Sequence, residues 1–515
     1  MTAFKNIKMK KFIINKGIIA LFLVVLFSGS CTKLEEDLYG RLSPENFFTN
    51  DAEVLSALAG VYNQMGFTSN GGNGWRIINL GTDEAIIPAR SDGRWFDGGV
   101  WIEFARHTWT PTNNRIASGY AEIFRAIGAA NAVLESLQNS PNKENLKAQM
   151  AEVRAVRAYA YFYALDLFGN VPIVTTARIE PSNLPTNKTR QEVFDFVVSE
   201  LRAASADLPS ATVVNRANYY PRMTKQAAFS ILAITYLNAQ VYTGTPKWTE
   251  AIEMSNNVIS SNAYIITPNY FDNFRPNNEG SREFIYAISI DPGKLAGGNN
   301  FAQRVLHDSH RFKYNLPFTP QNGFTTTEEA FDRYENQDIR KTMILNGPQV
   351  DAAGNPLKTI NGSQNLVLIP HQNIQNAAEN EGFRLLKWLP DATWVNGAAG
   401  NDVASIRYAD ILLIKAEALL RSGGSTTDAL TLVNQVRQRS SATPLATVSL
   451  RNILDERGRE LIYEGSRRRD LIRFGDYFTG TWKYKTTITP DFRKLYPIPV
   501  VELNANAALK QNPGY

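Results

Sequence analysis

The sequence predicts a mainly α-helical protein in which a helical scaffold carries a large loop-rich subdomain and little β-structure. Two observations lead to this expectation. Apolar residues recur at helical spacing over several long segments, many of which begin or end with recognisable capping residues. Residues 262–400, by contrast, are rich in Asn, Gly and Pro, and only Glu283–Ile290 has the pattern of a strand.

Residues 1–30 have the features of a signal peptide. Lysines but no acidic residues precede an apolar run from Ile18 to Phe27, which is shorter than the roughly 20 residues of a membrane span. Small residues then lead to Cys31, the only cysteine. Because a lone free thiol is a liability in an oxidising compartment, we expect Cys31 to be lipidated. The alternative is an ordinary signal peptide followed by an incidental cysteine.

The excess of positive charge belongs to this leader. The whole chain has 54 Lys and Arg against 49 Asp and Glu, and five of the lysines lie in residues 1–30. The mature chain is therefore close to neutral, which argues against a nucleic-acid partner. It also leaves the lipid, rather than charge, as the expected attachment to a membrane.

The N-terminal region, residues 44–261, should contain most of the scaffold. An acidic tether, residues 31–43, precedes a helix that we expect to start at Pro44 with Ser43 as its N-cap. A loop insertion follows at 66–114, where seven glycines fall between Gly71 and Gly99. Further helices are predicted over 117–138, 150–168, Thr189–Ala206, Thr224–Val241 and Trp248–Ser260.

Local signals support several of these boundaries. Gly169 stands where a left-handed residue ends a helix, and Thr189 with Glu192 forms a capping box. The last two helices form a pair rich in Ala and Tyr, and Asp402–Arg421 with Thr426–Arg439 forms another. Such pairs are similar to tetratricopeptide units, so the scaffold is expected to be an α-α superhelix of that kind.

The C-terminal region, residues 262–515, should comprise the loop-rich stretch 262–400, helical residues 401–475 and a docked tail, 476–515. We expect one long charged helix after Leu450, in which Glu464 and Arg468 pair at i,i+4. Arg467, Arg468 and Arg469 could instead hold an anionic ligand. The structural interpretation is favoured, with these residues pinning the C-terminal tail to the scaffold.

The loop insertion concentrates aromatic residues. Trp75, Trp95, Trp101 and Trp109 are four of the eight tryptophans of the chain. Trp101 and Trp109 have the alternating neighbours of buried segments, whereas Trp75 and Trp95 lie beside glycines and charges and are expected to be exposed. Indole rings stack on the apolar faces of sugars, and nearby polar side chains can bond the hydroxyl groups.

This chemistry predicts a set of ligand-binding residues. From the loop insertion the set contains Trp75, Trp95, Phe96, Asp83 and Arg90, and from residues 310–324 it contains Tyr314 and Phe318. The alternative is that the tryptophans only pack the glycine-rich loop onto the scaffold.

Several segments together resemble the SusD/RagB family of nutrient-uptake lipoproteins. They are AEVRAVRAYAYFYALDLFGNVPIV (151–174), RYADILLIKAEAL (407–419), LVNQVRQRS (432–440), ERGRELIYEGSRRRDLIRFG (456–475, the signature segment below) and LYPIPVVELNANAALKQNPGY (495–515). The resemblance spans almost the whole chain. It implies four tetratricopeptide-like helix pairs, with a ligand surface built from the loop insertion and residues 310–324.

The resemblance also implies where the protein acts and with what. Members of this family sit on the outer membrane, anchored by lipid, and pass oligosaccharides, or in some branches peptides, to a SusC-type TonB-dependent transporter. Glu35-Glu36-Asp37 after Cys31 is similar to the signal that sends such lipoproteins to the cell surface. We therefore expect an outer-membrane lipoprotein that faces the exterior.

Catalytic and cofactor motifs are missing from the sequence. It contains no HExxH, P-loop or GxSxG pattern. His307 and His310 could clasp a metal at i,i+3, but no third ligand follows by spacing, so neither a metal nor a cofactor is expected. The function expected is non-catalytic glycan capture. An oligopeptide-binding protein of the same architecture, a glycoside hydrolase on a helical scaffold and a pure tetratricopeptide adaptor remain as alternatives.

Overall fold

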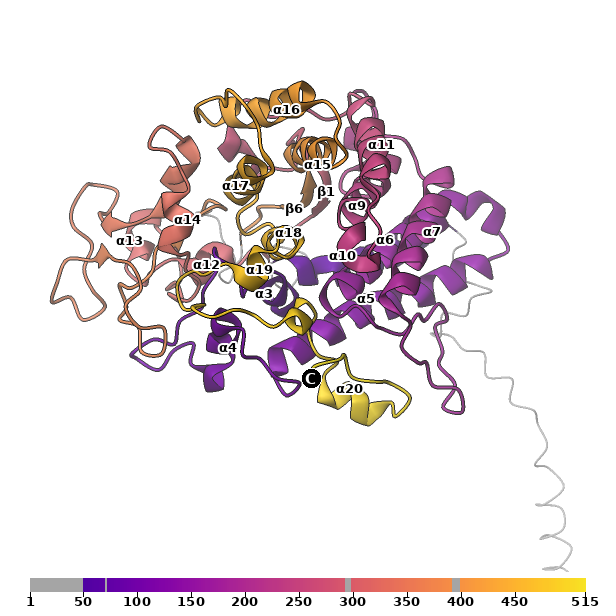
Figure 1. Ribbon diagram of the computed structural model, residues 1–515, viewed down its shortest axis with the longest axis horizontal. Coiled ribbons are helices and arrows are strands. Elements are labelled where there is room, and N and C mark those ends of the chain that lie inside the picture. Colours follow the sequence, from indigo (N-terminus) through magenta and orange to yellow (C-terminus); the bar gives the residue numbers. More distant parts are fainter. Residues whose placement is uncertain (1–49, 70–71, 292–297, 391–398) are drawn as a thin grey trace, which may run out of the picture. The chain divides into compact units, whose positions relative to one another are not determined.

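Helices packed side by side form one half of the protein. The structure, a computed structural model, describes residues 50–69, 72–291, 298–390 and 399–515. Figure 1 shows α5 to α11 on the right, α15 to α18 beside them toward the centre, and the loop-rich segment with α12 to α14 on the left. The mainly helical scaffold predicted from the sequence is confirmed.

The helices of the N-terminal region largely follow the sequence pattern. They are α2 (Asp51–Gln64), α3 (Asn73–Asn79), α4 (Val100–Arg106), α5 (Asn114–Gln138), α6 (Lys147–Leu167), α7 (Arg190–Asp207), α8 (Arg216–Tyr219), α9 (Lys225–Leu237), α10 (Ala239–Thr243) and α11 (Trp248–Ile259). The predicted start at Ser43 and Pro44 lies outside the described residues. The described helix α2 begins after Asn50, whose side chain accepts a bond from the Glu53 amide.

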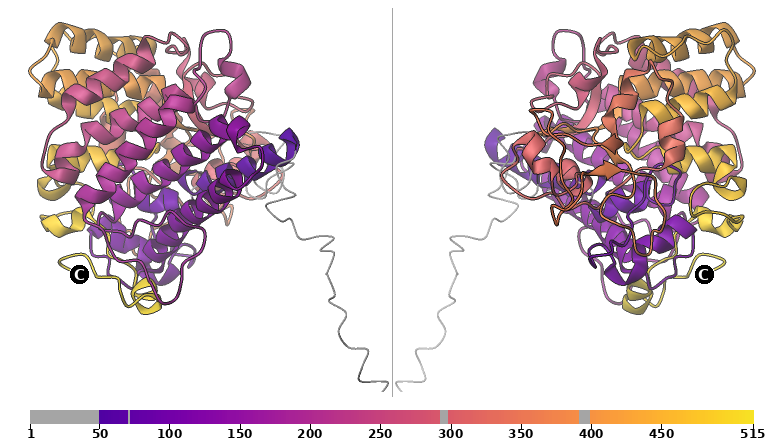
Figure 2. Two further views of the ribbon diagram at one scale, coloured as in Figure 1. Left: turned by 90° about the vertical axis from the view of Figure 1, so that its right-hand side faces the viewer. Right: turned by 90° about the vertical axis from the view of Figure 1, so that its left-hand side faces the viewer.

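The predicted caps are present. The Thr189 side chain accepts from the backbone N–H of Glu192, and the Glu192 carboxylate accepts from that of Thr189, so α7 begins with a full capping box. Gly169 has φ +69°, the left-handed conformation expected after α6. Helices that are close in sequence pack against each other, namely α5 and α6, α6 and α7, α9 and α11, and α15 and α16 (Figure 2).

A short antiparallel sheet packs against α9 and α15 of the scaffold. Strand β1 (Phe284–Ile288), which the sequence predicts, pairs with β6 (Val403–Arg407). The expected helical start at Asp402 is therefore wrong, because residues 403–407 extend to pair with β1 and the helix begins only at Tyr408.

The described part of residues 262–400 contains only short elements, as predicted. Besides β1 these are α12 (Phe301–Val305), α13 (His310–Tyr314), α14 (Glu328–Asp332), β2 (Ile344–Leu345), β3 (Gly347–Pro348), β4 (Val367–Leu368) and β5 (Arg384–Leu385), with 3₁₀ turns at Tyr270–Asn273 and Ile339–Met343. An isolated bridge between Ile86 and Thr325 fastens this region to the loop insertion. The right-hand view of Figure 2 shows the coil of this region facing the viewer.

The C-terminal helices differ from expectation again after Leu450. They are α15 (Tyr408–Arg421), α16 (Thr426–Arg439), α17 (Leu450–Glu460), α18 (Arg467–Phe474), α19 (Asp476–Thr479) and α20 (Val500–Ala505). The single charged helix predicted after Leu450 is wrong. A turn separates α17 from α18, with Tyr463 at φ +66° and Gly465 at φ +81°. Continuing one helix through these two left-handed residues is impossible.

Most charges of the signature segment are buried in ion pairs. We call the group formed by Glu283, Asp338, Arg340, Lys387, Arg407, Arg437, Arg439, Glu456, Glu460 and Glu464 the ionic cluster. Glu464 pairs with Lys387 and Arg407, so the predicted Glu464–Arg468 pair is wrong.

Arg468 holds the C-terminal tail, as expected. Its Nη2 donates to the Lys494 carbonyl, and its guanidinium lies 4.7 Å from the centroid of the buried Tyr496 ring. Asn512 donates to the carbonyls of Phe168 and Tyr496, which ties the end of the chain to α6. Within the described part of the chain, no helix is both long and apolar enough to cross a membrane.

Candidate functional site

An open depression of about 490 Å³ lies where the loop insertion meets the loop-rich region. Its lining residues are Arg94, Trp95, Asp308, Thr319, Pro320 and Gln321. Two segments more than 200 positions apart in sequence thus form one surface. The expectation that the loop insertion and residues 310–324 come together is met here, with Asp308 lying just outside the predicted range.

Trp95 forms the aromatic part of the depression. Its side chain is half-buried, and its indole Nε1 donates to the Gln321 carbonyl at 2.8 Å. The ring lies against Gly323, where a Cβ atom would overlap the indole, and Phe324 packs edge-on at 5.6 Å between centroids. Trp95 also has φ +60°, a conformation rare for a bulky residue. Its indole is therefore held in a fixed orientation, and it is partly exposed where the sequence analysis expected an exposed ring.

An arginine between two carboxylates forms the polar part. Arg94 donates to both oxygens of Asp308, at 3.0 to 3.2 Å, and through Nε to Asp92 at 2.8 Å. The side chains of Arg94 and Asp308 keep 33% and 18% exposure. Carboxylate oxygens that remain accessible can accept hydrogen bonds from sugar hydroxyls, and the remaining guanidinium N–H groups can donate.

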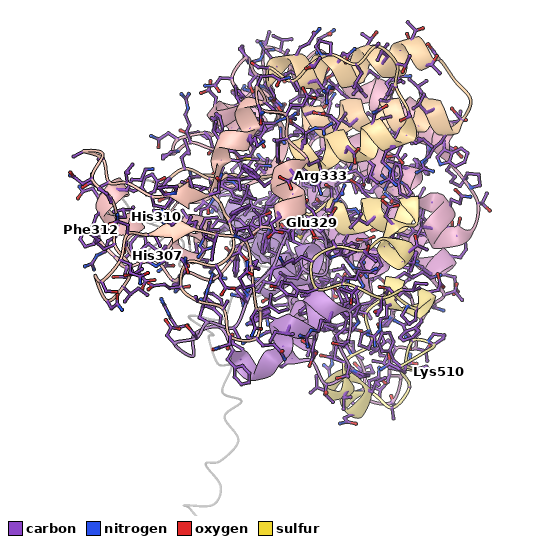
Figure 3. All side chains as sticks on the ribbon, turned by 60° about the vertical axis from the view of Figure 1, so that its left-hand side comes forward. His307, His310, Phe312, Glu329, Arg333 and Lys510 are labelled. Atoms are coloured by element: carbon purple, nitrogen blue, oxygen red, sulfur yellow. The ribbon has the colours of Figure 1, made fainter. Side chains whose placement is uncertain are left out.

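Two buried histidines shape the turn that carries Asp308. His307 Nε2 lies 2.9 Å from Glu379, and its Nδ1 accepts from the Ser309 amide. His310 Nδ1 accepts from the His307 amide, and its Nε2 contacts Gln349. Burial lowers the pKa of His307 to about 2 and that of His310 to about 4, so both are neutral at physiological pH. Figure 3 shows the two histidines beside Phe312.

These contacts account for both histidines without a metal. No group of three His, Cys, Asp or Glu side chains that could hold a metal ion occurs among the described residues.

Exposed aromatic residues flank the depression. Phe96, a predicted ligand residue, is 55% exposed, and Phe312 is 60% exposed. Arg311 links Phe312 to the depression, because its guanidinium lies 4.6 Å from the Phe312 ring and its Nη1 donates to Thr319. The predicted residues Tyr314 and Phe318 are half-buried and pack against an apolar cluster that includes Leu306, Leu316 and Leu386.

The expected exposure of Trp75 is wrong. Only 2% of its side chain is accessible, and its Nε1 donates to the Tyr463 carbonyl at 2.9 Å. Its ring stacks on Phe324 with an interplanar angle of 4°. The glycine before Trp75 allows close packing rather than exposure, since a Cβ at Gly74 would overlap Phe67. Trp101 and Trp109 are buried, as predicted.

Asp83 and Arg90 also point into the interior, so the structure contradicts their prediction as ligand contacts. Asp83 pairs with Arg467 and Arg333; burial opposes its ionisation, but these two guanidinium groups outweigh it and hold its pKa well below the usual range. Arg90 is 3% exposed and donates to the carbonyls of Asn322, Ala378 and Glu381. Both residues fasten the loop insertion to the rest of the protein.

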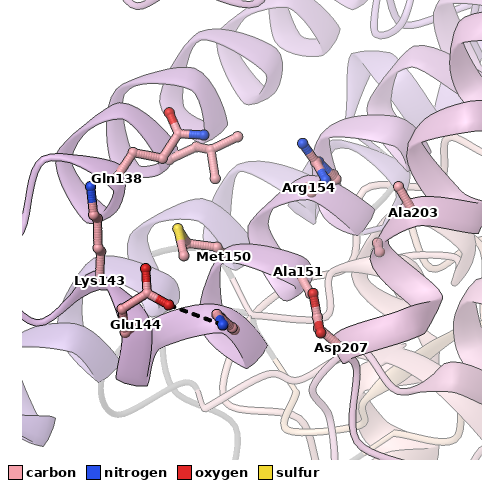
Figure 4. A pocket seen from close by; sticks show the side chains of 11 residues that line it. Gln138, Lys143, Glu144, Met150, Ala151, Arg154, Ala203 and Asp207 are labelled. Atoms are coloured by element: carbon pink, nitrogen blue, oxygen red, sulfur yellow. Dashed lines mark ion pairs between the residues drawn. The ribbon is translucent and has the colours of Figure 1, made fainter.

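Two other hollows lie away from the depression at Trp95. One, about 320 Å³, lies between α5, α6 and α7 and is lined by charged, aliphatic and small side chains such as Lys143, Glu144 and Ala151 (Figure 4). The other, about 310 Å³, lies beside α2 and β1, and its Tyr286 is almost fully buried. The second is also lined by the half-buried Tyr62, but neither hollow is formed where the loop insertion meets the loop-rich region, as the depression at Trp95 is.

Sequence reasoning missed several residues of the site. Asp308, Thr319, Gln321 and Gly323 carry no motif of their own, and their roles follow from contacts across the two segments. Phe312 could have been found, because it lies in the aromatic stretch 310–324. Cys31 and its signal peptide lie outside the described residues, and the boundaries of the predicted domains stay predictions.

Comparison with known families identifies the chain. The model of the "SusD family" matches residues 231–515, more than half of the sequence, and a model described as "Starch-binding associating with outer membrane" matches residues 36–237. The chain belongs to the SusD family. This confirms the resemblance found in the sequence.

Individual relatives agree with this assignment. Starch-binding protein SusD of Bacteroides thetaiotaomicron is 28% identical over 463 residues, covering 79% of this chain and 80% of that protein. SusD-like protein P25 of Formosa agariphila is 25% identical over 543 aligned residues, covering 96% of this chain and 99% of that protein. The second relative therefore extends the similarity to nearly the whole sequence.

Solved structures share the fold. A laminarin-binding SusD-like protein superposes with a TM-score of 0.73 at 24% identity, covering 90% of this chain and 100% of that one. Surface glycan-binding protein A of Bacteroides thetaiotaomicron, solved with laminarihexaose, gives a TM-score of 0.72 at 21% identity, with 90% and 99% coverage. The helical fold class is thereby confirmed. Relatives are named as starch- or glycan-binding proteins, and family membership supports the prediction that this chain is not an enzyme.

Proposed function

We propose that this SusD-family protein is a lipid-anchored, glycan-binding protein on the outer face of the outer membrane, which captures oligosaccharides in the depression around Trp95. The observation that carries the proposal is the fixed, half-exposed indole of Trp95 beside the Arg94–Asp308 pair. A sugar ring has an apolar C–H face for the indole and hydroxyl groups for the carboxylate and guanidinium. The glycan ligands named for several relatives support the same ligand class.

Capture would serve import through a SusC-type TonB-dependent transporter. The support is family membership together with the lipoprotein signal that ends at Cys31. A few weak contacts suffice in this arrangement, because a ligand held beside the transporter has a high effective concentration there. Co-purification of a transporter with the tagged protein from outer membranes tests this partnership. Replacement Cys31→Ala should release the protein from the membrane fraction while leaving glycan binding intact.

Calorimetric titration of the mature protein tests the ligand class. The panel should contain neutral oligosaccharides of several linkages, including laminari- and malto-oligosaccharides, and a set of oligopeptides. Trp95→Ala should weaken glycan binding by about tenfold or more, because it removes the stacking surface. Trp248→Ala is the matched control, since Trp248 is also half-buried but lies at the start of α11. Binding of peptides and of no glycan would refute the proposal.

A further inference from the structure

The turn at the centre of the signature segment lies directly behind the ligand depression. Tyr463 lies between α17 and α18 in a left-handed conformation, with φ +66°, that an aromatic residue rarely adopts. Its side chain is 1% exposed. The ion pairs of the signature segment explain how the two helices are held, but they do not explain why an aromatic residue occupies this turn.

Tyr463 makes hydrogen bonds to three residues in two separate segments. Its backbone N–H donates to Glu84 Oε1 at 3.1 Å, and its carbonyl accepts from Trp75 Nε1 at 2.9 Å. Its hydroxyl donates to the Thr325 carbonyl at 2.8 Å. Tyr463 thus connects the turn between α17 and α18 to the beginning of the loop insertion and to the strand-like residues that follow Phe324.

A series of packed rings connects Tyr463 to Trp95. The Tyr463 ring packs edge-on against Trp75 at 5.1 Å between centroids. Trp75 stacks on Phe324 at 5.2 Å, and Phe324 packs edge-on against Trp95 at 5.6 Å. Because close-packed groups transmit strain, a displacement of the Tyr463 ring would be passed through these contacts to the Trp95 indole.

We propose that Tyr463 is a positioning residue for the ligand site, which acts through Trp75 and Phe324 to hold the Trp95 ring in its binding orientation. The inference rests on the proposed function for its effect on affinity, but the orientation of Trp95 can be measured without a ligand. It assigns a role in ligand binding to a segment whose charged residues serve the fold alone. The Thr325 carbonyl is the key contact, because Thr325 directly follows Phe324.

A matched pair of variants separates positioning from stability. Tyr463→Phe removes only the hydroxyl bond to Thr325. Tyr334→Phe is the control, because Tyr334 is 3% exposed and its hydroxyl donates to the Arg459 carbonyl at 2.9 Å. Both variants lose one buried hydroxyl–carbonyl bond near the signature segment, but Tyr334 lies outside the ring series.

The first measurement is glycan affinity by calorimetry, with the oligosaccharide that binds the unmodified protein best. Tyr463→Phe should bind it about three- to tenfold more weakly, the size of effect that one hydrogen bond can produce, whereas Tyr334→Phe should bind unchanged. Equal affinities of the two variants would overturn the inference.

The second measurement is fluorine NMR of protein labelled with 5-fluorotryptophan, with the Trp95 resonance assigned by its loss in Trp95→Phe. Tyr463→Phe should shift or broaden this resonance in the absence of ligand, and Tyr334→Phe should leave it unchanged. An unaltered Trp95 resonance in Tyr463→Phe would overturn positioning even if no glycan bound. If Tyr463→Phe does not fold, Trp75→Phe, which keeps a ring but loses the bond to the Tyr463 carbonyl, should give the same two effects.

Discussion

The ionic cluster and the ligand depression use the same types of residue under opposite conditions. In the cluster, Arg407 contacts Glu283, Glu460 and Glu464, and its side chain has no exposed surface. In the depression, Arg94 pairs with Asp92 and Asp308 while a third of its side chain remains exposed. Each guanidinium has carboxylate partners, but only that of Arg94 can also meet a ligand. Exposure, rather than residue type, separates a structural charge from one that can bind.

The contrast between the ionic cluster and the ligand depression also explains how the depression can be open to solvent and still rigid. Exposed ion pairs contribute little stability, so the depression needs support from the buried side. That support comes from the rings beneath Trp95 and from the signature segment behind them. Changes in the two regions should therefore have separable effects, with the cluster affecting stability and the depression affecting affinity.

The largest effect is expected from Arg407→Met. Removing this guanidinium leaves three buried carboxylates with too little positive charge, which should lower the free energy of unfolding by about 3–5 kcal/mol. Denaturant titration measures the loss, and calorimetry on the folded fraction should show unchanged glycan affinity. Arg178→Met is the control, since Arg178 pairs with Glu180 at 84% side-chain exposure and should be neutral. Equal stabilities of the two variants would contradict the role of the cluster.

The second effect concerns Glu84, which lies between the two regions. Burial raises the pKa of Glu84 to about 7, and its Oε2 has no hydrogen-bond partner among the described residues. The unfolded carboxyl loses its proton near pH 4.5, before the folded one does, so the protein loses stability as pH rises from about 4.5 to 7. The amide of Glu84→Gln does not ionise, so this variant lacks the loss of stability that the Glu84 carboxyl causes as pH rises.

The stability of Glu84→Gln relative to the unmodified protein should therefore improve between pH 4.5 and pH 8, by about 2–3 kcal/mol. Unfolding midpoints at the two pH values provide the test. Any constant cost of the substituted amide cancels in the comparison. A stability difference that is the same at both pH values would show that Glu84 is ionised normally in the folded protein.

The third effect concerns the contact between Gly323 and the Trp95 indole. Gly323→Ala would place a methyl group against the Trp95 ring and displace it, which should weaken glycan binding by about tenfold. Gly128→Ala is the matched control, because Gly128 lies on α5 with open space around its Cβ position, and alanine there should stabilise slightly. Unchanged affinity in Gly323→Ala would show that the orientation of Trp95 is unimportant.

The sequence was sufficient to predict features that depend on local chemistry. The capping box at Thr189, the left-handed Gly169, the burial of Trp101 and Trp109, and the meeting of two aromatic segments all follow from periodicity, turn residues or family resemblance. These features are set by neighbours along the chain or by the fold shared within the family.

Features that depend on distant partners were predicted poorly. Trp75 and Trp95 both lie near glycines and charges, but Tyr463, 388 positions away, accepts the indole bond that fixes Trp75 in the core. Asp83 is placed in the same way by Arg333 and Arg467. Nothing within the loop insertion distinguishes these residues from Arg94 and Trp95, because burial is decided by segments that meet it only after folding.

The smallest stability effect, and the sharpest contrast with Arg407, is expected from Asp308→Asn. The Arg94–Asp308 pair is partly exposed, so its loss should change the free energy of unfolding by less than about 1 kcal/mol. Glycan affinity should nevertheless fall by about three- to tenfold, because the amide is a weaker acceptor for sugar hydroxyls than the carboxylate. In parallel unfolding and calorimetric experiments, Asp308→Asn should thus lower glycan affinity but hardly change stability, whereas Arg407→Met should lower stability and leave affinity unchanged. If Asp308→Asn destabilised the protein strongly and bound glycan normally, the Arg94–Asp308 pair would stabilise the fold, as the ionic cluster does. The ligand would then have to bind elsewhere.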